Sequence, residues 1–133
     1  MALKLVHDAN WPTEEDKRMS SVSTEPDNEK GAYIVVFTFG LYSKTRVTIR
    51  YVLNDVQGRA EMVITNMSVL PSAWCGHGFG TTALELLLKN AIAQGCSAIQ
   101  AVQVQKQSER FWRKNNFEPL NNATNNFRYI KQV

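Results

Sequence analysis

The sequence predicts a mixed α/β fold: an antiparallel meander, then a strand–helix–strand parallel crossover, then a C-terminal helix and strand. Two observations support this prediction. β-Branched and aromatic runs separated by short turn sequences come first, as in hairpins. One long helical pattern then lies between two further strand patterns, which is the order of a parallel crossover. The length of 133 residues suits a single domain, and we expect a short N-terminal part over 1–30 and a core over 31–133.

The N-terminal part is expected to hold little regular structure. Residues 3–7 are expected to form a short strand, and a short helix is expected to start within 11–16, where acidic residues would occupy the first turn. Residues 20–30 are rich in Ser, Asp, Asn, Glu and Pro, so we expect a loop there.

Three strands are expected next. Residues 33–39 are β-branched and aromatic, which predicts a strand buried on both faces. Residues 46–51 alternate polar and apolar side chains, which predicts a half-exposed strand joined to the first by a hairpin. A turn over 54–58 leads to a third strand over 61–70.

The second half alternates helices and strands. Apolar side chains recur at helical spacing from Leu84 to Ile92, and Gly95 is placed to end that helix. Residues 98–104 follow as a strand. Residues 107–116 are expected to form a short helix with Phe111 on its apolar side, and residues 127–130 a last strand.

Composition narrows the function classes. No apolar run approaches the ~20 residues needed to span a bilayer, and the first residues do not resemble a signal peptide, so we expect a cytoplasmic protein without a membrane segment. Cys75 and Cys96 make no disulfide framework or zinc spacing, so no metal site is expected.

Charge is distributed unevenly along the chain. Residues 1–30 hold seven acids and four bases, whereas residues 31–133 hold eleven bases and five acids. The basic excess indicates either plain solubility or a partner that carries phosphate groups. A phosphate-rich cofactor would suffice, so nucleic acid is not required.

A glycine-rich turn, Cys75-Gly76-His77-Gly78-Phe79-Gly80, precedes the long helix. Glycine lets the backbone approach a ligand closely, and the N–H groups of a helix's first turn bind anions. The turn therefore predicts a phosphate ligand, against the alternative of a tight turn without one. No lysine follows as in a nucleotide P-loop, and Thr81 breaks the dinucleotide fingerprint.

Two segments carry a family resemblance. Val69-Leu70-Pro71, the glycine turn and the leucines of the following helix resemble the core motif of the GNAT N-acetyltransferase superfamily. Residues 108–119 resemble that family's final helix, and the resemblance covers about 31–133. It implies acetyl-coenzyme A as cofactor, with pantetheine between the third strand and the next parallel strand. The cofactor-binding residues that it implies are Met67, Val69, Leu70, Cys75, Gly76, His77, Gly78, Phe79, Gly80, Thr81, Ser108 and Phe111.

The catalytic groups are less clearly indicated. Trp112 stands where the family often has a tyrosine that protonates the leaving thiolate, and tryptophan cannot take that role. Glu61 is the only acid of the third strand, and alternation would place it on the face of Met67 and Val69 unless a bulge intervenes. We predict Glu61 as the general base, against the alternative of a solvated strand end.

The resemblance implies an N-acetyltransferase that transfers an acetyl group to a primary amine, on a small molecule or a protein. The alternative is a catalytically degenerate GNAT-like module for coenzyme A binding or protein interaction. A nucleic-acid-directed function ranks last, because no strand interleaves aromatic and basic residues. An exposed strand edge over 46–53 would permit a homodimer.

Overall fold

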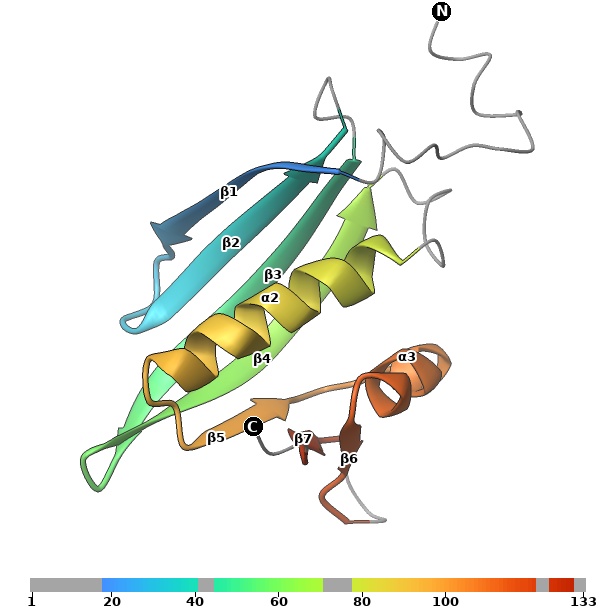
Figure 1. Ribbon diagram of the computed structural model, residues 1–133. Coiled ribbons are helices and arrows are strands. Elements are labelled where there is room, and N and C mark those ends of the chain that lie inside the picture. Colours follow the sequence, from blue (N-terminus) through green and yellow to red (C-terminus); the bar gives the residue numbers. More distant parts are fainter. Residues whose placement is uncertain (1–17, 41–44, 71–77, 122–124, 131–133) are drawn as a thin grey trace, which may run out of the picture.

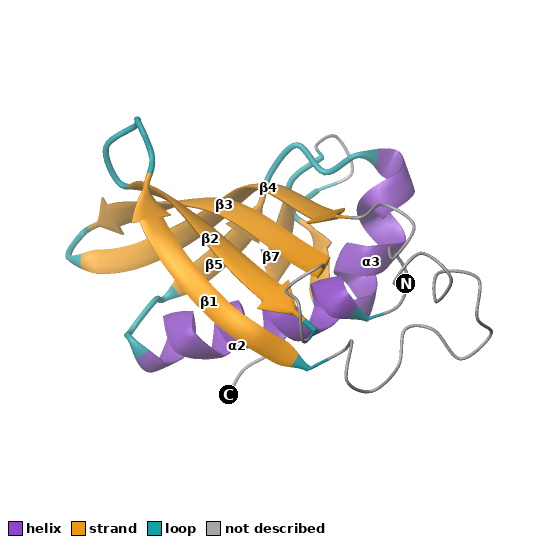
Figure 2. Cartoon of the chain, turned by 90° about the horizontal axis from the view of Figure 1, so that it is seen from above, coloured by secondary structure: helices purple, strands orange, loops and turns teal. Residues whose placement is uncertain are grey.

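The computed structural model describes residues 18–40, 45–70, 78–121 and 125–130. Within these ranges the chain forms a mixed sheet of seven strands in the order β1-β2-β3-β4-β5-β7-β6 (Figure 1). Helix α2 packs along one face of this sheet (Figure 2), and we call the opposite one the far face. The elements are β1 Met19–Pro26, β2 Ala32–Phe39, β3 Thr45–Val56, β4 Arg59–Leu70, α2 Phe79–Ala93, β5 Ala98–Ala101, the 3-10 turn Lys106–Ser108, α3 Glu109–Lys114, β6 Phe117–Pro119 and β7 Phe127–Tyr129.

The predicted antiparallel meander is confirmed. β2 pairs with β3, and β3 pairs with β4, both antiparallel. β3 and β4 are joined by a tight turn at Gln57 and Gly58, whose φ angles of 54° and 82° are those of a hairpin turn that matches strand twist. The Asp55 carboxylate accepts a hydrogen bond from the Gly58 amide at 2.9 Å. Because β3 ends at Val56 and β4 begins at Arg59, the turn is shorter than the expected 54–58.

The prediction of a loop over 20–30 is wrong for most of that range. Met19–Pro26 form β1, which pairs antiparallel with β2. Its side chains after Met19 are exposed, so the polar composition is that of an edge strand held by backbone hydrogen bonds, with side chains in water. The sheet therefore begins before the expected core boundary at residue 31.

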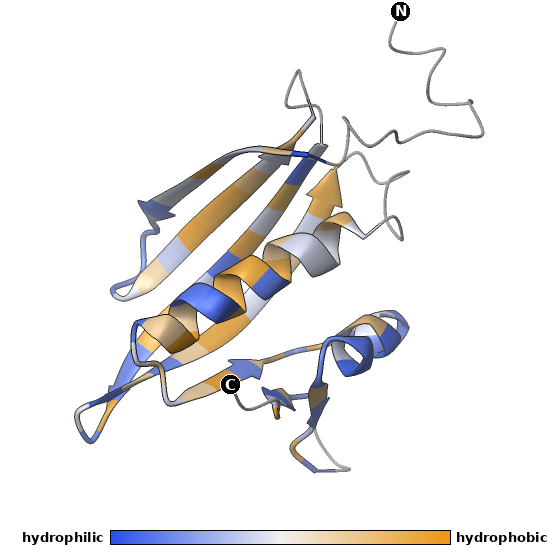
Figure 3. Ribbon diagram, in the orientation of Figure 1, coloured by the Kyte–Doolittle hydropathy of each residue, from blue (hydrophilic) through white to orange (hydrophobic). Residues whose placement is uncertain are grey.

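The core lies between the sheet and α2. In β2 the side chains of Val35, Phe37 and Phe39 are buried and those between them only partly. The strand is thus buried on one face, and the expectation of burial on both faces is wrong. Hydropathy follows this arrangement, with apolar residues along the central strands and α2 (Figure 3).

The parallel crossover is confirmed. The chain runs from β4 through α2 to β5, and β4 and β5 pair in parallel. The helix ends where expected, because Gly95 adopts a left-handed φ of 94° that stops the helix. β5 is shorter than the expected 98–104, since its pairing with β4 stops at Ala101.

The C-terminal segment contains β6, a strand that was not expected, and β7, which covers most of the strand expected over 127–130. β7 lies between β5 and β6 and pairs antiparallel with both. The short helix α3 turns Trp112 inward, with 6% of its surface exposed, whereas Phe111 is only partly buried. Trp112 rather than Phe111 is therefore the main core residue of this helix.

The prediction that residues 46–53 form an exposed strand edge is wrong. β3 lies inside the sheet between β2 and β4, and the edges of the described sheet are β1 and β6. The expected homodimer loses its basis in that edge. The strand expected over 3–7 and the helix start over 11–16 lie outside the described residues. Among the described helices, none is long and apolar enough to cross a membrane.

Candidate active site

The two parallel strands separate after a short ladder. β4 and β5 pair from Glu61↔Ala98 to Ile64↔Ala101, and the Val102 amide donates a last hydrogen bond to the Ile64 carbonyl at 3.0 Å. β4 continues to Leu70 while paired with β3 on its other side. In the described part of the chain, the β5-facing backbone edge of residues 65–70 therefore has no strand partner. Backbone N–H and C=O groups that are buried away from water require hydrogen-bond partners, so this edge can bind a ligand.

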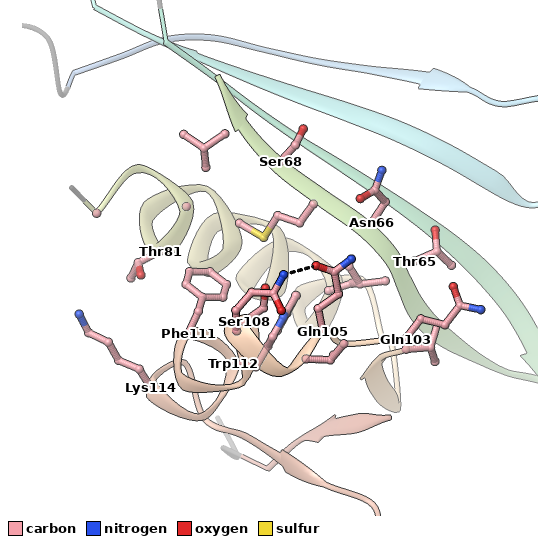
Figure 4. A pocket seen from close by; sticks show the side chains of 18 residues that line it. Thr65, Asn66, Ser68, Thr81, Gln103, Gln105, Ser108, Phe111, Trp112 and Lys114 are labelled. Carbon is pink, nitrogen blue, oxygen red and sulfur yellow. Dashed lines mark hydrogen bonds between the residues drawn. The ribbon is translucent and has the colours of Figure 1, made fainter. Parts of the chain in front are cut away.

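A cavity of about 670 Å³ occupies the place where the strands separate. This volume lies within the usual range for small-molecule sites. β4, the start of α2, the segment after β5 and α3 all contribute to its walls (Figure 4). The lining residues are Ile64, Thr65, Asn66, Met67, Ser68, Val69, Gly78, Gly80, Thr81, Val102, Gln103, Val104, Gln105, Gln107, Ser108, Phe111, Trp112 and Lys114.

The start of α2 forms one end of this cavity. Gly78 caps the helix with a φ of 90°, and the Thr82 amide donates the first bond of the helix to the Gly78 carbonyl at 3.0 Å. The amides before Thr82 have no acceptor within the helix, and no acid lies in its first turn. Lys114 lies at the same end of the cavity as Thr81 (Figure 4). This end is suited to an anion.

Gly80 lets three elements meet closely. A Cβ atom at this position would lie 3.1 Å from Met67 Cε and 3.3 Å from Phe111 Cε1. β4, α3 and the first turn of α2 therefore approach one another at Gly80, and a larger residue would push these side chains apart.

Buried contacts hold α3 against the cavity. The Asn115 side chain is 6% exposed and donates to the Phe111 carbonyl at 2.9 Å and to Thr81 Oγ1 at 3.4 Å. The Trp112 ring packs edge-on against Phe111 and Phe117, with centroids 5.3 and 5.0 Å away. α3 is thus attached both to the core and to the first turn of α2.

The sequence of this chain matches the family model described as acetyltransferase (GNAT) family over residues 6–117. The chain belongs to the GNAT acetyltransferase family. It is accordingly an acetyltransferase, and acetyl-coenzyme A is its cosubstrate. Membership favours the enzyme over the degenerate module.

Solved structures share the fold of this acetyltransferase at low identity. AtaTR bound with acetyl-coenzyme A is 14% identical with a TM-score of 0.55, over 75% of this chain and 68% of that chain. NAA60 of Arabidopsis thaliana in complex with a bisubstrate analogue is 10% identical with a TM-score of 0.56, over 84% and 100% of the two chains. The KacTA–DNA complex is 12% identical with a TM-score of 0.55, over 77% and 69%. No curated protein matches the sequence.

Most of the expected cofactor residues that the structure describes line the cavity of the acetyltransferase. Leu70 and Phe79 do not. Leu70 is 58% exposed at the end of β4, and Phe79 is buried in the core with its ring 5.1 Å from that of Phe39. Cys75, Gly76 and His77 lie outside the described residues. The lining residues expected from the sequence are Met67, Val69, Gly78, Gly80, Thr81, Ser108 and Phe111.

A bulge in β4 corrects the expected orientation of Glu61. Thr65 has no partner in β3, because Tyr51 pairs with Ile64 and Arg50 pairs with Asn66. The residues that face α2 are therefore even-numbered before the bulge and odd-numbered after it. Glu61 lies on the far face, not on the face of Met67 and Val69, and it is not among the residues that line the cavity.

Sequence reasoning missed several polar residues of the cavity. Gln103, Gln105 and Gln107 follow β5 and line it, and Gln107 donates to Gln105 across 2.6 Å (Figure 4). Gln103 has a left-handed φ of 55°, which is costly for a residue other than glycine and is common at functional sites. The alternation of glutamines over 103–107 was the available signal.

Proposed function

We propose that this acetyltransferase transfers the acetyl group of acetyl-coenzyme A to a primary amine, with the cofactor lying between β4 and β5. One observation carries the proposal: the cavity combines an unpaired strand edge along one wall with a helix N-terminus at one end. Pantetheine carries amide groups that would pair with the backbone of residues 65–70. The pyrophosphate would accept hydrogen bonds from the amides of residues 78–81 and face Lys114.

The proposed chemistry is direct attack. The amine nitrogen forms a bond to the thioester carbonyl carbon, the carbon–sulfur bond breaks, and coenzyme A leaves as a thiolate. The amine loses one proton to a base, and the thiolate takes up one proton from solvent. A backbone N–H on the unpaired edge near Val69 would stabilise the oxyanion, and holding both reactants together would supply much of the rate. Since a thiol has an ordinary pKa of ~8.5, thiolate departure near neutral pH needs no strong acid, which fits tryptophan at position 112.

We propose Glu61 as the general base, acting through water. Glu61 lies eight residues before Val69, a separation of about 26 Å along an extended strand, which is too long for direct proton transfer from an amine beside Val69. Glu61→Gln should lower the rate at neutral pH by at least ~10-fold without changing acetyl-coenzyme A affinity. Glu118→Gln, at an exposed position of β6, is the matched control. Full activity of Glu61→Gln would remove this residue from the mechanism.

We also propose that the amine is carried by a large acceptor, such as a peptide N-terminus or an aminoacyl group. One fold neighbour supports this choice: AtaT complexed with acetyl-methionyl-tRNAfMet has a TM-score of 0.51 at 10% identity. A panel of peptides, aminoacyl-tRNAs and small polyamines, assayed for free thiol release, tests the acceptor class. Turnover with polyamines alone would contradict it.

Calorimetry and thermal unfolding test the cofactor assignment. A ligand that binds only the folded state at 100 times its Kd stabilises that state by about 2.7 kcal/mol, so acetyl-coenzyme A should raise the melting temperature clearly. No shift at millimolar acetyl-coenzyme A, together with no heat of binding, would contradict the proposed cofactor site.

A further inference from the structure

The bulge at Thr65 lies at the point where β4 leaves β5. The last β4–β5 pair is Ile64↔Ala101, and Thr65 is the next residue of β4. Before the bulge, Met62 and Ile64 face α2 with 3% and 1% of their surfaces exposed. After it, Met67 and Val69 pack against that same core and line the cavity. A shift of one residue would turn this pair to the far face.

The Arg50 side chain holds this bulge from the neighbouring strand. Its Nη1 donates to Thr65 Oγ1 at 2.9 Å, and the Thr65 hydroxyl donates to the Arg50 carbonyl at 3.3 Å. A bulged residue is left out of the strand ladder, and these two bonds attach it to β3 by its side chain. The Thr65 hydroxyl thus acts as both acceptor and donor toward one residue.

Two acids fix the guanidinium in place. Arg50 Nε donates to Asp27 Oδ2 at 2.6 Å, and Nη2 donates to Glu29 Oε1 at 3.1 Å. Each of its three nitrogens therefore has a partner, and the Arg50 side chain is 26% exposed. Both acids belong to the turn between β1 and β2, so the contacts connect that turn to the bulge.

We propose that Arg50 is a positioning residue for acetyl-coenzyme A, which it serves by holding the β4 bulge in register. The proposal rests on the proposed cofactor site, because it concerns the strand that would bind pantetheine. Arg50 contacts no cofactor itself. It determines that Met67 reaches the first turn of α2, where the methyl group lies close to Gly80, and that the unpaired backbone of residues 65–70 keeps its spacing from the start of that helix.

Paired variants test this role. Arg50→Met keeps the aliphatic stem and removes every donor, and Thr65→Val removes the hydroxyl at nearly constant shape. Thr65→Ser keeps the hydroxyl. Arg46→Met is the matched control, because Arg46 lies on the same strand and face but its side chain makes no hydrogen bond or ion pair with the described residues. For each variant, calorimetry measures the Kd for acetyl-coenzyme A, and thermal unfolding measures whether the protein folds. The nuclear Overhauser effect between the Met67 methyl and Gly80 α protons reports the register of β4.

We expect Arg50→Met and Thr65→Val each to weaken acetyl-coenzyme A binding roughly tenfold, the size of a lost charge-assisted hydrogen bond. The double variant should be little worse than either single one, and the Met67–Gly80 contact should weaken in all three. Thr65→Ser should bind acetyl-coenzyme A more tightly than Thr65→Val and keep more of the Met67–Gly80 contact, and Arg46→Met should behave as wild type. Wild-type affinity and an intact Met67–Gly80 contact in folded Thr65→Val would overturn the proposal, as would equal losses in Thr65→Val and Thr65→Ser. If the wild-type protein does not bind acetyl-coenzyme A, the proposed cofactor site fails, and the Met67–Gly80 contact still decides whether Arg50 holds the register.

Discussion

The two glycines at the ends of α2 allow a controlled test of the anion site. Gly78 and Gly95 have φ angles of 90° and 94°, and no atom lies within 4 Å of a Cβ built on either. Replacing either glycine by Glu therefore costs the same left-handed backbone strain, about 1–2 kcal/mol, without a clash. For a chain of 133 residues this lowers the melting temperature by roughly 3–8 °C. The helix dipole favours an acid at the N-terminal position and disfavours it at the C-terminal one, so Gly78→Glu should be the more stable variant without ligand.

For acetyl-coenzyme A binding, the order of the two variants should reverse, with Gly78→Glu the more impaired. Two unit charges about 6 Å apart repel by roughly 0.7–2.8 kcal/mol at an effective dielectric constant of 20–80, which is about 3- to 100-fold in Kd for each phosphate charge. Gly78→Glu should therefore lose acetyl-coenzyme A binding, and Gly95→Glu should keep it. Calorimetry at low salt is the assay, because salt screens exposed charges.

A neutral companion separates charge from backbone strain. Gly78→Gln carries the same left-handed strain as Gly78→Glu without its charge, so it should bind acetyl-coenzyme A more tightly than Gly78→Glu. Unchanged affinity in folded Gly78→Glu would show that the phosphates bind elsewhere. Equal losses in Gly78→Glu and Gly95→Glu would show that helix stability, not the anion site, controls binding.

Three further predictions concern single side chains. Trp112→Phe should lower the melting temperature, because the smaller ring packs less well against Phe111 and Phe117. It should keep most of the thiol-release activity, and Trp112→Tyr should keep or raise that activity. A large loss of rate in folded Trp112→Phe that still binds the cofactor would give Trp112 a chemical role. The hydrogen bond from Arg50 lowers the pKa of Asp27, so this carboxylate stabilises the fold above its ordinary pKa of ~3.9, and the contribution is lost as the pH falls through the lowered value. The melting temperatures of wild type and Asp27→Asn should thus differ most near neutral pH and converge in acid, and a constant difference would contradict this. Thr45 is fully buried and its hydroxyl has no hydrogen-bond partner among the described residues. Since an unpaired buried polar group destabilises the fold by about 1–3 kcal/mol, Thr45→Val should raise the melting temperature. A lower melting temperature would show that the hydroxyl does have a hydrogen-bond partner.

Strong local patterns were sufficient for much of the fold. β2 is predictable from its β-branched and aromatic run, and α2 from its apolar spacing and from Gly95, whose left-handed φ stops the helix. The same holds for the start of α2 as a candidate anion site, since helix amides before Thr82 lack acceptors whatever the tertiary context. In each case the information lies within a few residues of the feature.

Features that depend on a partner strand were decided only by the tertiary structure. β1 is polar and exposed, so nothing in its own residues distinguishes it from a loop until β2 offers a backbone edge. The face on which Glu61 lies depends on the bulge at Thr65, which is held by Arg50 on one side and opens into the cavity on the other. The gap between β4 and β5 likewise exists only because two strands diverge. Backbone hydrogen bonds join segments without regard to their side chains. For this reason the sequence determined the helix start that is a candidate anion site, whereas only the tertiary structure decided the shape of the cleft beside it.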